Sequence, residues 1–363
     1  MKRNAYVILL IVLVAGFVTA SCRPARPAPK IVLGSDVIVK NLFYKNQKLR
    51  GVMSISFGRF SSDSENEIAI VSKNGAQFLT YAGAERAFIS FDREGGKTVS
   101  IKVHSDGIYE FMNRGGGWQQ VSLLNSKGNT KWSYPSDDNG AANDMVAGDL
   151  NGDGELEFIV GMNARGGLRV LDANGNLIHR YEAGNVFSVE VLDINNDGAP
   201  EILHSDSGVG IVIRRANGDK IGVIKNTSGH FSLLQPSILY KETIIVYIDK
   251  NDNLNLIDIK GNIIKTFKLP GWGYRSTEGT VAYLNGSKAP PYFAFVRTIK
   301  ATLGRSALFI FDSAGQLIYH EIMPSSHLAI AAFKMQGQDY EKLLVGENSS
   351  VWEYSVNPNI AVK

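Results

Sequence analysis

The stretch that decides the fold is Asp149-Leu150-Asn151-Gly152-Asp153-Gly154-Glu155-Leu156-Glu157. A matching stretch begins 44 residues later and reads Asp193-Ile194-Asn195-Asn196-Asp197-Gly198-Ala199-Pro200-Glu201. We number the residues of each loop from position 1 to position 9. Both loops place oxygen-bearing side chains at positions 1, 3, 5 and 9 and glycine at position 6. A repeated polar loop that leads each time into an apolar run indicates a repeated structural unit.

The oxygen side chains predict that each loop wraps a calcium ion, because calcium takes about six to eight oxygen ligands in a flexible geometry. The candidate ligands are Asp149, Asn151, Asp153, the main-chain carbonyl of Glu155, and Glu157 in the first loop, and Asp193, Asn195, Asp197, the main-chain carbonyl of Ala199, and Glu201 in the second. Glycine at position 6 permits the sharp bend that such a loop needs. We therefore expect two calcium ions with a structural role.

Other readings of the two loops fit less well. An EF-hand requires Glu at position 12, where this chain has Val160 and His204. Magnesium demands octahedral geometry and keeps several waters. The remaining alternative is a pair of plain turns whose acids are solvated, and the matched ligand positions of the two copies favour calcium over it.

A second repeat covers most of the chain and consists of an apolar strand, a turn with glycine and another strand. The turn glycines lie 43 to 54 residues apart, at Gly83, Gly128, Gly175, Gly218, Gly261 and Gly315. A period of about 45 residues with several short strands is typical of a four-stranded propeller blade. In the unit that holds the first loop we expect strands at 145–148, 157–162, 168–172 and 177–181, so the loop joins the first strand to the second.

The number of units predicts how the ring closes. Six marked units cover roughly 54–323, and a seventh begins at His327 but runs out of chain after three strands. The segment 36–44 reads as a spare strand that completes the seventh unit, which would remove two exposed strand edges. We therefore predict an all-β fold, a seven-bladed β-propeller of four-stranded antiparallel blades closed by pairing of the N- and C-terminal strands. A β-sandwich pair, a solenoid, or a ring of six or eight blades are the alternatives.

The first unit contains a degenerate copy of the polar loop. Position 1 is Arg59 and position 6 is Ser64, although position 9 is still an acid, Glu67. We expect no ion in this loop.

The N-terminal segment 1–21 has the features of a targeting signal. Lys2 and Arg3 precede an apolar run from Tyr6 to Val18, which is too short to span a membrane comfortably. The order Thr19-Ala20-Ser21-Cys22 resembles a bacterial lipoprotein signal. That resemblance implies that Cys22, the only cysteine of the chain, is acylated (for example with palmitate) and anchors the mature protein. The alternative is an ordinary secretory signal with an incidental cysteine.

Residues 22–30 form a Pro-rich basic tether, and residues 31–363 form the propeller domain. Removing 1–21 leaves 36 basic and 35 acidic side chains. A mature chain with so little net charge argues against a nucleic-acid partner. Arg23 follows the lipidated cysteine in place of the Asp that retains lipoproteins in the inner membrane. By analogy with lipoproteins we expect the cell envelope, with the outer membrane favoured over the inner.

The two polar loops and the apolar runs after them resemble the FG-GAP/VCBS repeat β-propellers, the group that includes integrin α-subunit heads. The full motif covers only two units, at 147–161 and 192–202, while the weaker hairpin pattern covers most of the mature chain. The resemblance implies calcium at the positions given above and a scaffold that binds proteins or carbohydrates.

We therefore interpret the protein as a calcium-binding lipoprotein that binds an envelope protein or a surface glycan and is not an enzyme. Its six histidines are scattered, and no catalytic constellation surrounds them. Two Gly-rich loops with Trp118 and Trp272 are candidate binding surfaces. The alternatives are a propeller enzyme that acts on polysaccharide or uses a quinone, and a scaffold in outer-membrane assembly. A cluster of acids in the central funnel would favour the enzyme.

Overall fold

The computed structural model describes residues 36–60, 66–102, 109–115, 120–135, 142–195, 197–225, 227, 230–234, 243–249, 251, 253–270, 274–299, 304–327, 329–334 and 337–359. All of them belong to a compact unit that spans Ile31–Lys363. The described residues form strands and no helix, so they include no helix long and apolar enough to cross a membrane. The predicted signal peptide, the tether and Cys22 lie outside the described residues.

The described strands pair into seven antiparallel sheets of four strands, which confirms the predicted propeller blades. Blade 1 contains β2 (Val52–Gly58), β3 (Glu67–Ser72), β4 (Gly75–Thr80) and β5 (Glu85–Ser90). Blade 2 contains β6 (Gly95–Lys102), β7 (Tyr109–Gly115), β8 (Val121–Leu124) and β9 (Thr130–Tyr134). Blade 3 contains β10 (Ala142–Gly148), β11 (Glu157–Met162), β12 (Leu168–Leu171) and β13 (Leu177–Tyr181).

The second half of the ring repeats this order. Blade 4 contains β14 (Val189–Leu192), β15 (Glu201–Asp206), β16 (Gly210–Arg214) and β17 (Lys220–Ile224). Blade 5 contains β18 (Phe231–Leu233), β19 (Ile245–Ile248), β20 (Asn253–Ile257) and β21 (Ile263–Lys268). Blade 6 contains β22 (Tyr274–Ala282), β23 (Tyr292–Ile299), β24 (Ser306–Phe311) and β25 (Leu317–Met323). Blade 7 contains β26 (Ile330–Lys334), β27 (Glu341–Glu347), β28 (Ser350–Val356) and β1 (Ile38–Lys45).

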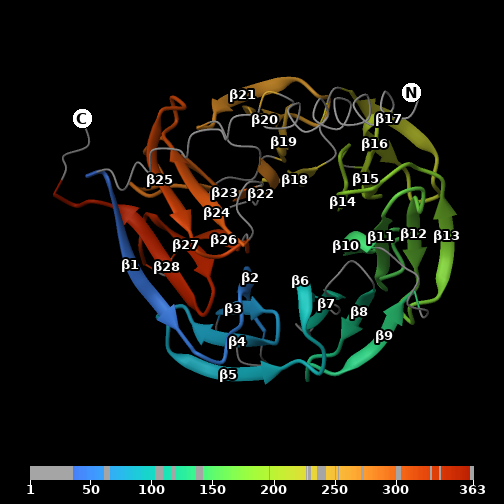
Figure 1. Cartoon of the computed structure of the whole chain (residues 1–363), viewed down its shortest axis with the longest axis horizontal. Coiled ribbons are helices and arrows are strands. Elements are labelled where there is room, and N and C mark those ends of the chain that lie inside the picture. The colour runs from blue at the N-terminus through green and yellow to red at the C-terminus, as the bar shows by residue number, and fades with distance from the viewer. Residues whose placement is uncertain are drawn as a thin grey trace, which may run out of the picture. The chain divides into compact units, whose positions relative to one another are not determined.

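The blades are arranged around a central axis, with the first strand of each unit innermost and the last strand at the rim (Figure 1). The innermost strands contact those of the neighbouring blades around the ring. The six marker glycines each lie between the third and fourth strands of a blade. They all have positive φ, from 82° to 90°, as the hairpin turn requires. The strands expected for the third unit match β10 to β13 closely.

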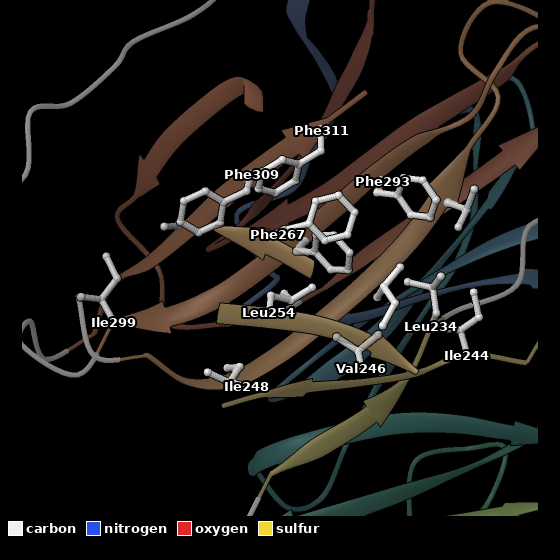
Figure 2. Packing of buried hydrophobic residues seen from close by; sticks show 14 residues of the cluster. Leu234, Ile244, Val246, Ile248, Leu254, Phe267, Phe293, Ile299, Phe309 and Phe311 are labelled. Carbon is white, nitrogen blue, oxygen red and sulfur yellow. The ribbon is translucent and has the colours of Figure 1, made fainter. Parts of the chain in front are cut away.

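The hydrophobic core consists of seven clusters, and each cluster lies between two adjacent blades. Along β11, Phe158 and Val160 pack toward blade 2, whereas Ile159 between them packs toward blade 4. Both faces of a middle strand are therefore buried, which explains why these strands read as continuous apolar runs. Figure 2 shows the cluster between blades 5 and 6, where Phe267 meets Phe293 and Phe311.

The ring closes as predicted, because β1 pairs with β28 from Ile38 opposite Val356 to Lys45 opposite Ser350. A polar contact joins this closing strand to the previous blade. Lys40 on β1 forms an ion pair of 2.5 Å with Glu321 on β25 and lies 4.4 Å from the centroid of the Trp352 ring. Glu321 also accepts hydrogen bonds from the hydroxyl groups of Tyr319 and Tyr354, both at 2.9 Å. One carboxylate therefore connects the closing strand, β28 and blade 6.

We predict that Glu321→Ala lowers the free energy of unfolding by about 2–4 kcal/mol, because it leaves a poorly solvated cation and two hydroxyl groups without their acceptor. Urea denaturation measures this change. The matched control is Glu182→Ala, which removes an exposed ion pair of 3.6 Å to Arg180 and should cost less than about 1 kcal/mol. Equal effects of the two substitutions would contradict the closing role of Glu321.

Candidate functional site

The two acidic loops lie on adjacent blades, and each joins the innermost strand to the second strand, as predicted. The first loop connects β10 to β11 in blade 3, and the second connects β14 to β15 in blade 4. Their bases are in contact, because a Cβ added to Gly148 would lie 2.6 Å from Val191 Cγ1. Glycine at this position therefore allows the two loops to approach each other.

The two loops have the same pattern of internal hydrogen bonds. Position 1 (Asp149, Asp193) accepts from the N–H of the glycine at position 6, at 3.0 and 2.9 Å. Position 3 (Asn151, Asn195) accepts from the N–H of position 5, and position 5 (Asp153, Asp197) accepts from the N–H of position 7, in each case at 2.8 Å. Gly154 and Gly198 have φ of 90° and 88°. The structure thus brings the side chains predicted at positions 1, 3 and 5 together in both copies.

The position-9 glutamate closes each loop from the start of the second strand. Glu157 Oε2 accepts from the N–H of Leu150 at 2.7 Å, and Glu201 Oε2 accepts from the N–H of Ile194 at 3.1 Å. The other oxygen of each carboxylate accepts from the side-chain amide at position 3, at 3.2 and 3.1 Å. The amide of Asn151 also donates to Asp153 Oδ2 at 2.9 Å. In the first loop, two carboxylate oxygens therefore accept from the side-chain amide of Asn151, which carries only a partial positive charge.

Electrostatic repulsion accompanies this arrangement. Glu157 is 8% exposed and Glu201 is 2% exposed. Burial raises the pKa of Glu157 above its ordinary value, and the nearby carboxylates of Asp153 and Asp149 raise it further, although the N–H of Leu150 offsets part of the effect. A bound cation would relieve both the burial and the repulsion.

Blade 1 shows how the position-9 glutamate is neutralised in a loop where Arg59 replaces the acid of position 1. Glu67 stands at position 9 and is 1% exposed. Its Oε2 accepts from the N–H of Phe60 at position 2, at 3.1 Å, as in the two acidic loops. Its Oε1 lies 3.5 Å from the Nε of Arg86 on β5. Within the described residues, no ion pair joins Glu157 or Glu201 to a basic side chain. A guanidinium therefore occupies the role in blade 1 that a cation would take in blades 3 and 4.

Blades 6 and 7 have other polar contacts at the start of the second strand. In blade 6, Tyr292 begins the second strand, and its hydroxyl accepts from the amide of Asn285 at 2.9 Å. In blade 7, Glu341 begins the second strand and accepts from the N–H of Tyr283 in blade 6, also at 2.9 Å. The strand start is thus a polar anchor in several blades, and among the described residues a cluster of acids surrounds it in blades 3 and 4.

The donor set of the acidic loops fits calcium. No three His, Cys, Asp or Glu side chains among the described residues are gathered closely enough to hold a metal ion by themselves. A calcium loop does not require such a group, because amide and main-chain carbonyl oxygens complete its shell. Asn at position 3 and the carbonyls of Glu155 and Ala199 at position 7 are oxygens of this kind.

A second polar site, which the sequence analysis missed, lies on the innermost strands. Lys97 on β6 forms an ion pair of 2.5 Å with Asp144 on β10, and Asp144 accepts from the N–H of Val189 in blade 4 at 3.1 Å. Glu190 on β14 and Glu278 on β22 interact electrostatically with this pair. We call these four residues the channel cluster. The Lys97 side chain is 36% exposed, so water reaches the inner surface that it lines.

Burial changes the acidity of this cluster. It raises the pKa of Glu190 to about 8, and Asp144 and Glu278 contribute to the rise while Lys97 opposes it. It raises the pKa of Glu278 to about 7, with Lys97 opposing and Asp144 adding. Burial alone would lower the pKa of Lys97, but the nearby carboxylates raise it above its ordinary value. Asp144, Glu190 and Glu278 are three acids on innermost strands of the ring, in blades 3, 4 and 6.

A recurring sequence signal marks three residues of the channel cluster, although it does not show that they meet. Each of the first six units carries a polar or charged residue on its innermost strand or directly before it, at Ser54, Lys97, Asp144, Ser188, Ser232 and Glu278. Several of these residues bond to the next blade: Ser54 donates to Thr98 O, and Ser232 donates to Thr277 O. The candidate binding residues Trp118 and Trp272 lie outside the described residues.

Comparison with the solved structure of BBS1N supports the fold. No protein-family model matches the chain, and no curated protein sequence matches it. The structure of BBS1N in complex with ARL6DN is similar to this chain with a TM-score of 0.54 and 11% identity, over 90% of this chain and 98% of that one. The V. cholerae biofilm matrix protein Bap1 has a TM-score of 0.48 and 11% identity, over 90% and 83% of the two chains. BamB from Moraxella catarrhalis has a TM-score of 0.43 and 13% identity, over 83% and 85%.

We predict that Arg86→Met destabilises the protein by about 2–4 kcal/mol, because it leaves the Glu67 carboxylate buried without its cation. Adding Glu67→Gln to this variant should restore most of the loss, and a double-mutant cycle in urea measures the coupling. The control is Arg50→Met, whose ion pair to Glu94 is exposed and should contribute less than about 1 kcal/mol. Simple additivity of the Arg86 and Glu67 substitutions would contradict the account.

Proposed function

We propose that this protein is a calcium-binding, lipid-anchored β-propeller of the cell envelope that acts as a binding module for an envelope protein. The observation that carries the calcium proposal is the pair of adjacent loops with the same oxygen set and the same hydrogen-bond network. The Arg86–Glu67 pair of blade 1 supports it independently, because it places a positive charge beside the position-9 glutamate in a loop where Arg59 replaces the acid of position 1.

The role proposed for calcium is structural. Each ion would be held by positions 1, 3, 5 and 9 and by the carbonyl at position 7, and it would supply the positive charge that the clustered carboxylates lack. Because position 9 begins the second strand of the blade, the ion would fasten the loop to the sheet. The resemblance to FG-GAP/VCBS repeats supports this assignment. The degenerate loop of blade 1 is proposed to bind no ion.

The anchor and the partner follow from the sequence and the fold. We propose that Cys22 carries the lipid, that 22–30 holds the propeller away from the membrane, and that the outer membrane is the site of anchoring. The fold suits a binding module, since BBS1N, which shares it, was solved in complex with ARL6DN. A surface glycan is the other partner class that the resemblance implies.

The channel cluster favours a second candidate function, that of an enzyme. A carboxyl group with a pKa near neutrality is what general acid catalysis needs, and Glu190 and Glu278 are partly exposed carboxyl groups of this kind. A polysaccharide hydrolase is the reaction class that this pair would suit. We place it second because Lys97 and Asp144 also connect blades 2, 3 and 4 to one another, which gives the cluster a structural role.

We predict that calcium raises the melting temperature of the propeller and that a chelator lowers it. Calcium at 100 times the dissociation constant would add about 2.7 kcal/mol per site, which corresponds to several degrees. Glu157→Gln and Glu201→Gln should each reduce the response, and together they should abolish it. Glu67→Gln, at the equivalent position of blade 1, is the control and should leave the response unchanged. An identical melt in calcium and in chelator would contradict the proposal.

We further predict that crosslinking in intact cells, followed by purification of the lipidated protein and mass spectrometry, recovers one envelope protein in stoichiometric amount. Chelator and the Glu157→Gln/Glu201→Gln variant should both reduce its recovery if calcium maintains the binding surface. Recovery of no protein, together with polysaccharide hydrolysis that is lost in Glu190→Gln, would support the second candidate and overturn the first.

A further inference from the structure

The rim strands of blades 1 to 6 share a β-bulge. In each of these blades the register between the third and fourth strands shifts by one residue just after the marker turn. The shift places the third residue after the marker glycine in the bulge. The bulge residues are Arg86, Lys131, Ile178, Ile221, Ile264 and Ile318. Because a bulge re-aims a side chain, these residues occupy one structural position of the repeat with different chemistry.

In blades 1 and 2 the bulge residue is basic and pairs with a buried glutamate near the start of the second strand. The Nε of Arg86 lies 3.5 Å from Glu67 Oε1. The Nζ of Lys131 donates to the two carboxylate oxygens of Glu110, at 3.0 and 3.2 Å. Glu67 and Glu110 are only 1% and 7% exposed. The strand registers place the two pairs at equivalent positions of their blades.

Blades 5 and 6 have no charge at either position. The strand registers place Ile244 and Tyr292 where blades 1 and 2 have their glutamates. The bulge residues of these two blades are Ile264 and Ile318. In blades 1, 2, 5 and 6 the two positions therefore match, since both are charged or both are uncharged.

Blades 3 and 4 break this match. Glu157 and Glu201 are buried carboxylates at the start of the second strand, but the bulge residues are Ile178 and Ile221. These isoleucines are 46% and 43% exposed, so the core does not require them. The glutamate oxygen that faces Arg86 in blade 1 accepts here from the uncharged amide at position 3. Among the described residues, no ion pair supplies a cation to either glutamate.

We propose that the bulge residue determines how each of these blades balances the charge at the start of its second strand. A basic bulge residue supplies an internal cation in blades 1 and 2. Isoleucine at the same position leaves Glu157 and Glu201 dependent on an external cation. The inference rests on the proposed function, which assigns calcium as that cation. It adds that the choice between the two kinds of cation is made on the rim strand, outside the loop that would hold the ion.

The test moves the basic residue of blade 1 into the two acidic blades. Ile178→Arg and Ile221→Arg place a guanidinium at the bulge, where the half-exposed site can accept the longer side chain. In chelator, each variant should melt at least about 2 °C above the unsubstituted protein, because the new cation stabilises a buried carboxylate. The gain should disappear when Ile178→Arg is combined with Glu157→Gln, which removes the charge to be balanced. Thermal unfolding followed by circular dichroism measures these shifts.

The matched control is Ile264→Arg in blade 5. It adds the same side chain at the same bulge position of a blade where Ile244 replaces the glutamate, so it should give no gain in chelator. If the variants of blades 3 and 4 gain nothing, or if Ile264→Arg gains as much, the proposal is overturned. Ile178→Lys, which copies Lys131 of blade 2, provides the same comparison if arginine prevents folding.

The calcium response separates this inference from the proposed function. The rise in melting temperature that calcium produces should be smaller in Ile178→Arg than in the unsubstituted protein, because arginine already balances Glu157. An unsubstituted protein that melts identically in calcium and in chelator would overturn the calcium proposal. The role of the bulge residue would still be decided by the gain measured in chelator, where calcium plays no part.

Discussion

The structure depends on the burial of each blade between its two neighbours. Alternate side chains of β11 enter opposite interfaces, with Phe158 packed toward blade 2 and Ile159 toward blade 4. A sheet that is apolar on both faces cannot be stable alone in water, and an open row of such sheets would expose an apolar face at each end. Closure of the ring is thus a requirement of the core. Pairing of β1 with β28, supported by Lys40 and Glu321, provides it.

The start of the second strand is where the blades differ most in charge. A buried glutamate stands there in blades 1, 3, 4 and 7, as Glu67, Glu157, Glu201 and Glu341. Each glutamate accepts a hydrogen bond from a main-chain N–H, but the negative charge of the carboxylate is balanced differently from blade to blade. Arg86 balances Glu67 within the blade, and we propose calcium for Glu157 and Glu201. The glutamate thus accepts a main-chain hydrogen bond in all four blades, from its own loop in blades 1, 3 and 4 and from blade 6 in blade 7, while its electrostatic partner varies.

The fold was predictable from sequence because its signals are local and recur. The marker glycines, the apolar runs and the loop between the first and second strands each lie within a few residues, and the structure places all of them in the expected elements. That the side chains at positions 1, 3, 5 and 9 share one loop was predictable for the same reason, whereas their hydrogen-bond network was not predicted. Calcium itself stays a prediction.

The channel cluster and the Arg86–Glu67 pair could not be predicted in the same way. Lys97 and Asp144 are 47 residues apart, and they meet only because the innermost strands of neighbouring blades lie side by side. Glu278 joins them from blade 6, across the ring. Nothing in the local sequence of β5 shows that Arg86 turns back toward Glu67. Contacts of this kind depend on the closed ring, so they follow from the fold and not from any one segment.

The most direct test of the central claim is a count of bound calcium. Equilibrium dialysis of the purified propeller against calcium, followed by mass spectrometry of the metal, should give two ions per chain. It should give one in Glu157→Gln or Glu201→Gln, and two in Glu67→Gln. A protein that binds no calcium, or that loses an ion in Glu67→Gln while both acidic loops are intact, would contradict the account.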